Sequence, residues 1–245
     1  MSGSRGELVG EVVAVWRYPV KSMRGESLER AELTWNGLDG DRRHAFVLDG
    51  DRSRFPWLTG RRASALLRYA PRYDDPANLR KSPIQVGLPE GGALDLHAPA
   101  LRQRLEQEAG GRLGLIQVGR GIFDSLPVSV MTTATPAAIG AVVPAGGEPR
   151  RYRANIVIDA GPDAAHREAQ WVNGRLAFGN AGGPALRVNK RIDRCSMVTI
   201  DPDTAARDPD VLKAVVAQAE NCVGAYASAE TPGWVTVGDK VWLLR

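Results

Sequence analysis

Short apolar runs separated by turn-forming residues constrain the fold of this chain more than any other feature of its sequence. The longest such runs, including residues 156–158 and 211–219, fall far below the roughly 20 apolar residues that a membrane-spanning helix requires. Runs of this length, bounded by glycine, proline and asparagine, are typical of β-strands. The sequence therefore predicts a mainly β (α+β) protein with few helices and no membrane span.

Turn signals and hydrophobic periodicity place the elements along the chain. Alternating apolar residues predict strands at residues 11–18, 27–35, 44–48, 113–118, 128–131, 155–159, 186–188, 197–201, 234–237 and 241–244. The last two flank Gly238-Asp and predict a closing hairpin. Amphipathic spacing and capping residues predict helices at residues 99–109, 135–143 and 208–219.

One internal segment is suited to separate two parts of the chain. Residues 119–127 contain two glycines and a proline and lie between predicted strands. A length of 245 residues suits one large domain or two small ones that share an interface. We therefore expect a β-rich N-terminal domain over residues 7–118 and a second domain over residues 125–245.

Composition narrows the classes of function. Residues 1–7 contain no apolar signal core, so we expect a cytoplasmic protein whose two cysteines are thiols. Of 32 basic residues only five are lysine, which favours recognition of phosphate or carboxylate, although a GC-rich genome would produce the same bias. A net charge of +4, spread along the chain, does not favour nucleic-acid binding.

Common catalytic and cofactor motifs are missing from the sequence. Two cysteines and three scattered histidines do not have the spacing of a zinc site. Glycine-rich phosphate loops of the Rossmann or Walker type and a Gly-x-Ser-x-Gly elbow are also absent. These observations exclude most of the common enzyme classes.

Three polar segments could bind an anionic group. The first, residues 18–25, carries Lys21 and Ser22, and the second, residues 40–44, carries Arg42. In the third, Arg153 and Asn155 lie two residues apart and would share one face of an extended segment. An ordinary polar loop, a surface salt-bridge patch and a charged strand edge are the respective alternatives. A further segment, Thr59-Gly-Arg-Arg, has the same two interpretations as residues 40–44.

The segment around Cys195 is the most informative one. Arg194 precedes this cysteine, and its charge would favour the thiolate that binds soft metals. The alternative is a small buried apolar residue, which is the usual role of a free cysteine. Cys222 has no adjacent charge and is predicted to lie in the core.

Taken together and in order, five segments resemble the MOSC family, including its N-terminal β-barrel-like module. They are residues 18–25, Gly40-Asp-Arg, Arg153-Ala-Asn-Ile-Val-Ile, Arg194-Cys-x-x-x-Thr-Ile-Asp-Pro-Asp-Thr and Val237-Gly-Asp-x-Val. The resemblance implies a barrel-like C-terminal half packed against the β-rich N-terminal half. Two departures from the family pattern, Ala154 in place of proline and Ala205 in place of glycine, remove no ligand.

The resemblance also implies a site. In the amidoxime-reducing branch a cysteine binds molybdenum, and Cys195 matches that position as metal ligand and catalytic residue. Ser125 matches a hydroxyl position and Tyr226 a late aromatic contact. The family's pterin- and phosphate-binding residues correspond to Lys21, Ser22, Arg42, Arg153, Asn155, Asp193 and Arg194. Because these residues come from both halves, the molybdenum cofactor (Mo-molybdopterin) is expected in the cleft between them.

Three functions remain open at this stage. The first is reduction of an N-hydroxylated compound, of the amidoxime or hydroxylaminopurine type. The chain has no iron–sulfur cysteine set, so electrons would come from a separate ferredoxin- or flavin-type reductase. The second is a sulfur carrier or transferase that uses a persulfide on Cys195. The third is a non-catalytic molybdopterin-binding module.

Overall fold

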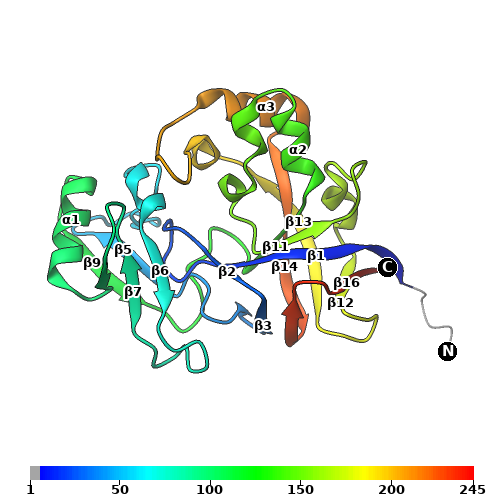
Figure 1. Ribbon diagram of the computed structural model, residues 1–245, viewed down its shortest axis with the longest axis horizontal. Helices are drawn as coiled ribbons and strands as arrows, with labels where there is room; N and C mark the ends of the chain where they lie inside the picture. The colour runs from blue at the N-terminus through cyan, green and yellow to red at the C-terminus, as the bar shows by residue number, and fades with distance from the viewer. Residues whose placement is uncertain (1–5) are drawn as a thin grey trace.

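The computed structural model describes residues 6–245 and confirms a mainly β fold built on a closed barrel (Figure 1). Seven strands follow one another around the barrel in the order β11-β10-β14-β13-β12-β16-β1, and antiparallel pairing of β1 with β11 closes it. β2 (Glu26–Leu28) pairs with the C-terminal end of β1. The barrel strands are β1 (Glu7–Arg17), β10 (Val128–Thr132), β11 (Ile156–Asp159), β12 (Arg175–Phe178), β13 (Ala185–Asp193), β14 (Cys222–Thr231) and β16 (Lys240–Leu244).

Apolar side chains that point inward fill the barrel. Ile156 and Ile158 of β11 alternate into the interior with the two-residue period of a strand. Val12 and Val15 of β1 are three residues apart, yet both are fully buried in the same core. An irregularity in the pairing of β1 with β11 between Val12 and Ala14 accounts for the extra residue.

The N-terminal half adds three small sheets and a helix. Leu101 and Leu105 of α1 (Pro99–Ala109) are completely buried against this half's own apolar cluster. The sheets pair β5 with β9, β6 with β7 and β8, and β15 with β3 and β4. Their strands are β3 (Arg30–Thr34), β4 (Gly37–Leu38), β5 (His44–Leu48), β6 (Ala70–Tyr73), β7 (Ile84–Gly87), β8 (Ala93–Asp95), β9 (Leu113–Gln117) and β15 (Gly233–Thr236).

Two helices cover the outside of the barrel, side by side at the top of Figure 1. α2 (Ala134–Gly140) contributes Ile139, and α3 (Pro209–Ala219) contributes Val211 and Val215, to a third apolar cluster. Short 3₁₀ helices occur at η1 (Ser64–Arg68), η2 (Pro144–Gly147), η3 (Pro149–Tyr152), η4 (Arg167–Trp171) and η5 (Ser196–Thr199). No helix within residues 6–245 is both long and apolar enough to cross a membrane.

The strand pairing crosses between the two predicted domains. β1 precedes the predicted boundary but belongs to the barrel, and β15 follows it but pairs with β3. The predicted closing hairpin is therefore wrong. Its two arms are strands, but they do not pair with each other. β16 lies between β1 and β12 and pairs with both, whereas β15 pairs with β3. The division into residues 7–118 and 125–245 stays a prediction about folding units.

Other local predictions fail for identifiable reasons. Residues 197–201 form no strand, because η5 turns there, with the Val198 amide donating to the Cys195 carbonyl at 3.1 Å. The Thr199 hydroxyl donates to the Ser196 carbonyl at 2.8 Å and stabilises the same turn. The strands β4, β6, β7, β8 and β12 were not predicted because each is only two to four residues long, and β14 was not predicted because glycine and alanine interrupt its larger apolar residues.

Gly10 offers a test of barrel closure. A Cβ atom at Gly10 would lie 2.3 Å from the Asp159 carbonyl oxygen, where β1 crosses β11. We expect Gly10→Ala to lower the free energy of unfolding by about 1–3 kcal/mol, the usual cost of overpacking. Urea denaturation would measure it, with Gly119→Ala as control because nothing lies within 4 Å of a Cβ there. Equal stability of the two variants would contradict this account of closure.

Candidate functional site

A cavity of about 320 Å³ is lined by residues of both halves of the chain. Its N-terminal wall includes Phe55, Thr59 and Arg61, and its C-terminal wall includes Tyr152 and Met197. Eight of the ten residues singled out in the sequence also line it: Lys21, Ser22, Arg42, Arg153, Asp193, Arg194, Cys195 and Tyr226. The structure thus brings together segments that are more than 170 positions apart, and their binding role stays a prediction.

Three of these residues have a left-handed backbone, which is uncommon outside glycine. The φ angles of Ser22, Arg42 and Arg153 are +64°, +50° and +53°. The Arg42 amide donates to the Tyr18 carbonyl at 2.6 Å, and the Arg153 amide donates to the Arg150 carbonyl at 3.2 Å. The prediction that Arg153 and Asn155 share one face of an extended segment is therefore wrong, because η3 ends in a turn at Arg153. Such backbone strain concentrates at functional sites.

The ring of Tyr18 lies against two guanidinium groups. The central carbon of Arg42 is 4.4 Å from the ring centre and that of Arg153 is 4.2 Å away. The phenol hydroxyl donates to the Ala154 carbonyl at 3.2 Å, and burial raises the pKa of Tyr18. This neutral ring holds two cations close together at the wall of the cavity. Tyr18 lies within the first polar segment, residues 18–25, but its residue type alone does not indicate this role.

Asn155 and Ser125 do not line the cavity. Asn155 is 1% exposed, and its Oδ1 accepts hydrogen bonds from the Ser129 amide at 3.1 Å and from Arg42 Nη1 at 3.3 Å. Asn155 therefore helps to hold the Arg42 guanidinium in place but does not line the cavity. Arg42 also pairs with the carboxylate of Asp41. Ser125 is exposed and outside the cavity lining.

Lys21 is paired with a carboxylate that the sequence analysis missed. Its Nζ donates to Asp124 Oδ1 at 2.6 Å and to the Ile122 carbonyl at 3.0 Å. Burial lowers the pKa of Lys21 despite the opposing effect of Asp124. Burial alone would raise the pKa of Asp124, but the charges of Lys21 and Arg42 lower it. A single Asp within a glycine-rich segment carries no local signal of this contact.

Arg194 donates all its side-chain bonds to the backbone. Its Nη1 donates to the Tyr152 carbonyl at 2.7 Å, and its Nε donates to the Val223 carbonyl at 2.8 Å. Burial lowers the pKa of this guanidinium. Arg194 therefore joins η3 to β14 beneath the cavity. The neighbouring Cys195 is exposed, so its thiol is accessible from the cavity.

Cys222 is half-buried, so the prediction that it lies in the core is wrong. Its Sγ donates to Asp193 Oδ1 at 3.3 Å, and burial raises the pKa of its thiol. Asp193 itself is exposed at the end of β13. The two cysteines differ in accessibility, which makes Cys222 a natural control for Cys195.

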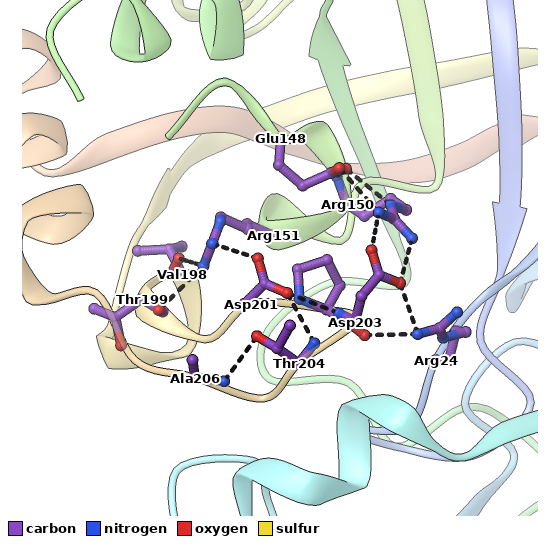
Figure 2. A network of polar contacts seen from close by, with 11 residues as sticks. Arg24, Glu148, Arg150, Arg151, Val198, Thr199, Asp201, Asp203, Thr204 and Ala206 are labelled. Carbon is purple, nitrogen blue, oxygen red and sulfur yellow. Dashed lines mark hydrogen bonds and ion pairs between the residues drawn. The ribbon is translucent and has the colours of Figure 1, made fainter. Parts of the chain in front are cut away.

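A polar network fastens the segment that follows Cys195 (Figure 2). Asp203 accepts from Arg150 Nη2 at 2.6 Å and from Arg24 Nη2, which belongs to the N-terminal half, at 2.8 Å. Arg151 is buried and donates to Asp201 Oδ2 at 2.8 Å and to the Thr199 carbonyl at 3.1 Å. The network therefore fixes η5, and with it Cys195, relative to both halves.

Positive charge dominates the lining of the cavity. Arg153 Nη1 donates to the Met23 carbonyl at 2.7 Å, but the buried Nη2 has no hydrogen-bond partner among the described residues. Burial lowers the pKa of Arg153 to about 10, which leaves it charged at neutral pH. An unpaired buried guanidinium nitrogen is costly, and an anion bound here would satisfy it. Among residues 6–245 no cluster of three or more His, Cys, Asp or Glu side chains could hold a bare metal ion.

A buried carboxyl group on η4 accepts a hydrogen bond from β14, the strand that also binds Arg194. Glu168 is 2% exposed, and its Oε1 accepts from the Gly224 amide at 3.1 Å and from the Thr135 hydroxyl at 2.9 Å. Gly224 follows Val223, whose carbonyl binds Arg194. Burial raises the pKa of Glu168 above its usual value of 4.5.

The raised pKa of Glu168 predicts a pH effect on stability. The folded chain binds more protons than the unfolded chain, so this group makes unfolding easier as the pH rises above about 4.5. We expect Glu168→Gln to gain stability relative to the native chain from about pH 5 to about pH 7, above the usual carboxyl pKa, since glutamine does not ionise. Urea denaturation at several pH values would test this, with the exposed Glu108→Gln as control. A pH-independent difference for Glu168→Gln would contradict it.

Comparisons with known proteins agree with this architecture. Residues 123–242 match the family described as MOSC domain, and residues 9–106 match the MOSC N-terminal beta barrel domain. "Mitochondrial amidoxime reducing component 2" of Bos taurus is 26% identical over 300 residues, which cover 98% of this chain and 85% of that protein. The crystal structure of the YuaD protein from Bacillus subtilis has a TM-score of 0.50 at 16% identity, covers 96% of this chain and 94% of that one, and shows the fold alone.

Proposed function

Because the chain belongs to the MOSC domain family, we propose that it is a molybdenum cofactor-dependent oxidoreductase that reduces N-hydroxylated compounds. The observation that supports this most is the pairing, in one cavity, of an accessible thiol with an unsatisfied buried guanidinium nitrogen. The similarity to an amidoxime reducing component suggests amidoximes as substrates. Hydroxylaminopurines are the second N-hydroxylated class that we propose.

The cavity residues fit the chemistry of the cofactor. A pterin dithiolene with a phosphate presents an anion and several hydrogen-bonding edges, and its metal accepts a soft protein ligand. Arg153 Nη2 offers the unsatisfied donor for the anion, and Cys195 offers the thiolate. The cofactor, when bound, supplies two-electron oxygen-transfer chemistry, and the protein supplies binding, orientation and electrostatics.

The remaining predicted residues divide into two roles. Lys21, Arg42 and Arg153 face the cavity with their charges and would hold the anionic part of the cofactor, together with Ser22 and Tyr226 at the lining. Asn155 and Arg194 would position those residues, since their own bonds go to Arg42 and to backbone carbonyls. A binding role for Ser125 would require movement, because it lies outside the cavity.

Electrons for this reaction would come from a separate ferredoxin- or flavin-type reductase. The two cysteines of the chain do not make an iron–sulfur set, and the sequence contains no nucleotide-binding motif of the Rossmann or Walker type. Turnover would therefore require a protein partner or an artificial reductant, in the cytoplasm as we expect.

Replacement of the two cysteines tests the proposal. Protein from a host that makes molybdenum cofactor should contain near-stoichiometric molybdenum, and Cys195→Ala should lose most of it and all turnover of an arylamidoxime. Cys222→Ala should retain both, because its thiol bonds to Asp193 and does not line the cavity. Elemental analysis and amidoxime reduction with reduced viologen would measure these effects.

The contrary results are equally specific. Full turnover in Cys195→Ala would exclude this cysteine as metal ligand. Native protein that stays free of molybdenum but carries a trappable persulfide on Cys195 would indicate a sulfur carrier. Bound molybdopterin without turnover of any N-hydroxylated compound would indicate a non-catalytic binding module.

A further inference from the structure

One wall of the cavity has no role in the function proposed so far. It is formed by Phe55, Thr59 and Arg61, which follow β5 in the N-terminal half. This wall lies next to the segment that carries Cys195, because a Cβ atom at Gly60 would be 3.0 Å from Met197 Sδ. A ligand group that reaches Cys195 can therefore contact this wall.

The backbone of this wall is held from both halves. Within the loop, the amides of Arg62 and Ala63 donate to the Thr59 carbonyl at 2.9 and 3.0 Å. From the C-terminal half, Arg207 Nη2 donates to the carbonyls of Gly60 at 3.0 Å and Arg61 at 2.9 Å. The position from which the Arg61 side chain extends is thus fixed before any ligand binds.

The Arg61 side chain, in contrast, has an uncommitted guanidinium. It lies 5.5 Å from the centre of the Phe55 ring and makes no ion pair with the described part of the chain. The other arginines of the lining, residues 42, 151, 153 and 194, all donate to carboxylates or carbonyls. Arg61 is also exposed, whereas Arg151 is buried and Arg153 is mostly so. It is therefore suited to a ligand that enters and leaves.

The Phe55 side chain adds an aromatic surface beside this charge. The ring is 37% exposed and lies between two cations, with Lys21 Nζ 5.3 Å from its centre. An exposed phenyl ring at the mouth of a charged cavity favours contact with a flat apolar group. A guanidinium fork next to it favours a carboxylate or a phosphate.

We propose that Arg61 and Phe55 form a substrate subsite for aromatic compounds that carry an anionic substituent. This assignment rests on the proposed function, because it places the N-hydroxylated end of the substrate toward Cys195. Arg61 then binds the carboxylate or phosphate, and Phe55 contacts the ring. The same anion chemistry could come from the phosphate of the cofactor, so the experiment separates the two sources.

Two probe compounds and three variants test the subsite. Benzamidoxime and its 4-carboxy derivative differ only in the anionic group, and each is assayed for turnover with reduced viologen and for binding to the holoprotein by calorimetry. We expect Arg61→Ala to weaken binding and lower kcat/KM of the carboxylated compound about tenfold, which is the effect of losing one charge-assisted contact. Benzamidoxime itself should be unaffected, and Arg61→Lys should recover part of the loss.

Arg112→Ala is the matched control, because the side chain of Arg112 is 87% exposed and lies outside this cavity. It should leave both compounds unchanged. An equal effect of Arg61→Ala on both compounds, or none on either, would overturn the subsite. Loss of molybdenum from Arg61→Ala would also overturn it and assign the anion to the cofactor. Binding that depends on Arg61 without turnover in the native protein would support the subsite and contradict the proposed reaction instead.

Discussion

The crowding of positive charge around one partly buried cavity is the constraint on which the rest of this structure depends. Lys21 is buried, Arg42, Arg153 and Arg194 are half-buried, and burial opposes the charge on each. In the described part of the chain, only two carboxylates, Asp41 and Asp124, pair with them directly. The ring of Tyr18 and a set of backbone carbonyls provide the remaining contacts that stabilise these four positive charges. One buried donor of these four side chains, Arg153 Nη2, has no partner within residues 6–245, and an anionic ligand would complete the arrangement.

The barrel explains how such an arrangement can persist. Left-handed backbone at Ser22, Arg42 and Arg153 costs on the order of 1 kcal/mol or more at each residue, and it is kept only where the surroundings require it. β1 leads directly to the first of these turns, and η3 delivers Arg153 just before β11 begins. Because β1 and β11 pair with each other, the turns at Ser22 and Arg153 are each joined to a strand that the barrel holds in place. A rigid scaffold thus carries the strained loops of the candidate site.

Local sequence signals predicted those elements whose ends are marked by particular residues, such as proline or glycine. α1 spans Pro99–Ala109 as expected, since proline begins it and Gly110 ends it in a left-handed turn, and β5 spans His44–Leu48 as expected. Partner choice is not local. The turn at Gly238 is present, yet nothing in residues 234–244 indicates that β16 pairs with β1 and β12 while β15 leaves for β3.

The same limit applies to the site. The motif residues could be found because cations, asparagine and cysteine recur at spacings that resemble a family. Their division of labour could not, because it depends on contacts between distant segments. Arg194 cannot be recognised from sequence as a bond between Tyr152 and Val223, nor Glu168 as the acceptor for Gly224. Arg61 lies in a polar segment that sequence alone leaves ambiguous, and only its place in the cavity distinguishes it from the other exposed arginines.

The contacts between the two halves divide into those that stabilise the fold and those that position the site. The exposed pair of Arg24 with Asp203 contributes at most about 1 kcal/mol, as exposed ion pairs do. Strands exchanged between the halves, β1 and β15, bury apolar core and carry the association. The polar network of Figure 2 is then available for placement of η5 and Cys195. Small changes in it would alter the position of the thiol in the cavity before they altered the stability of the fold.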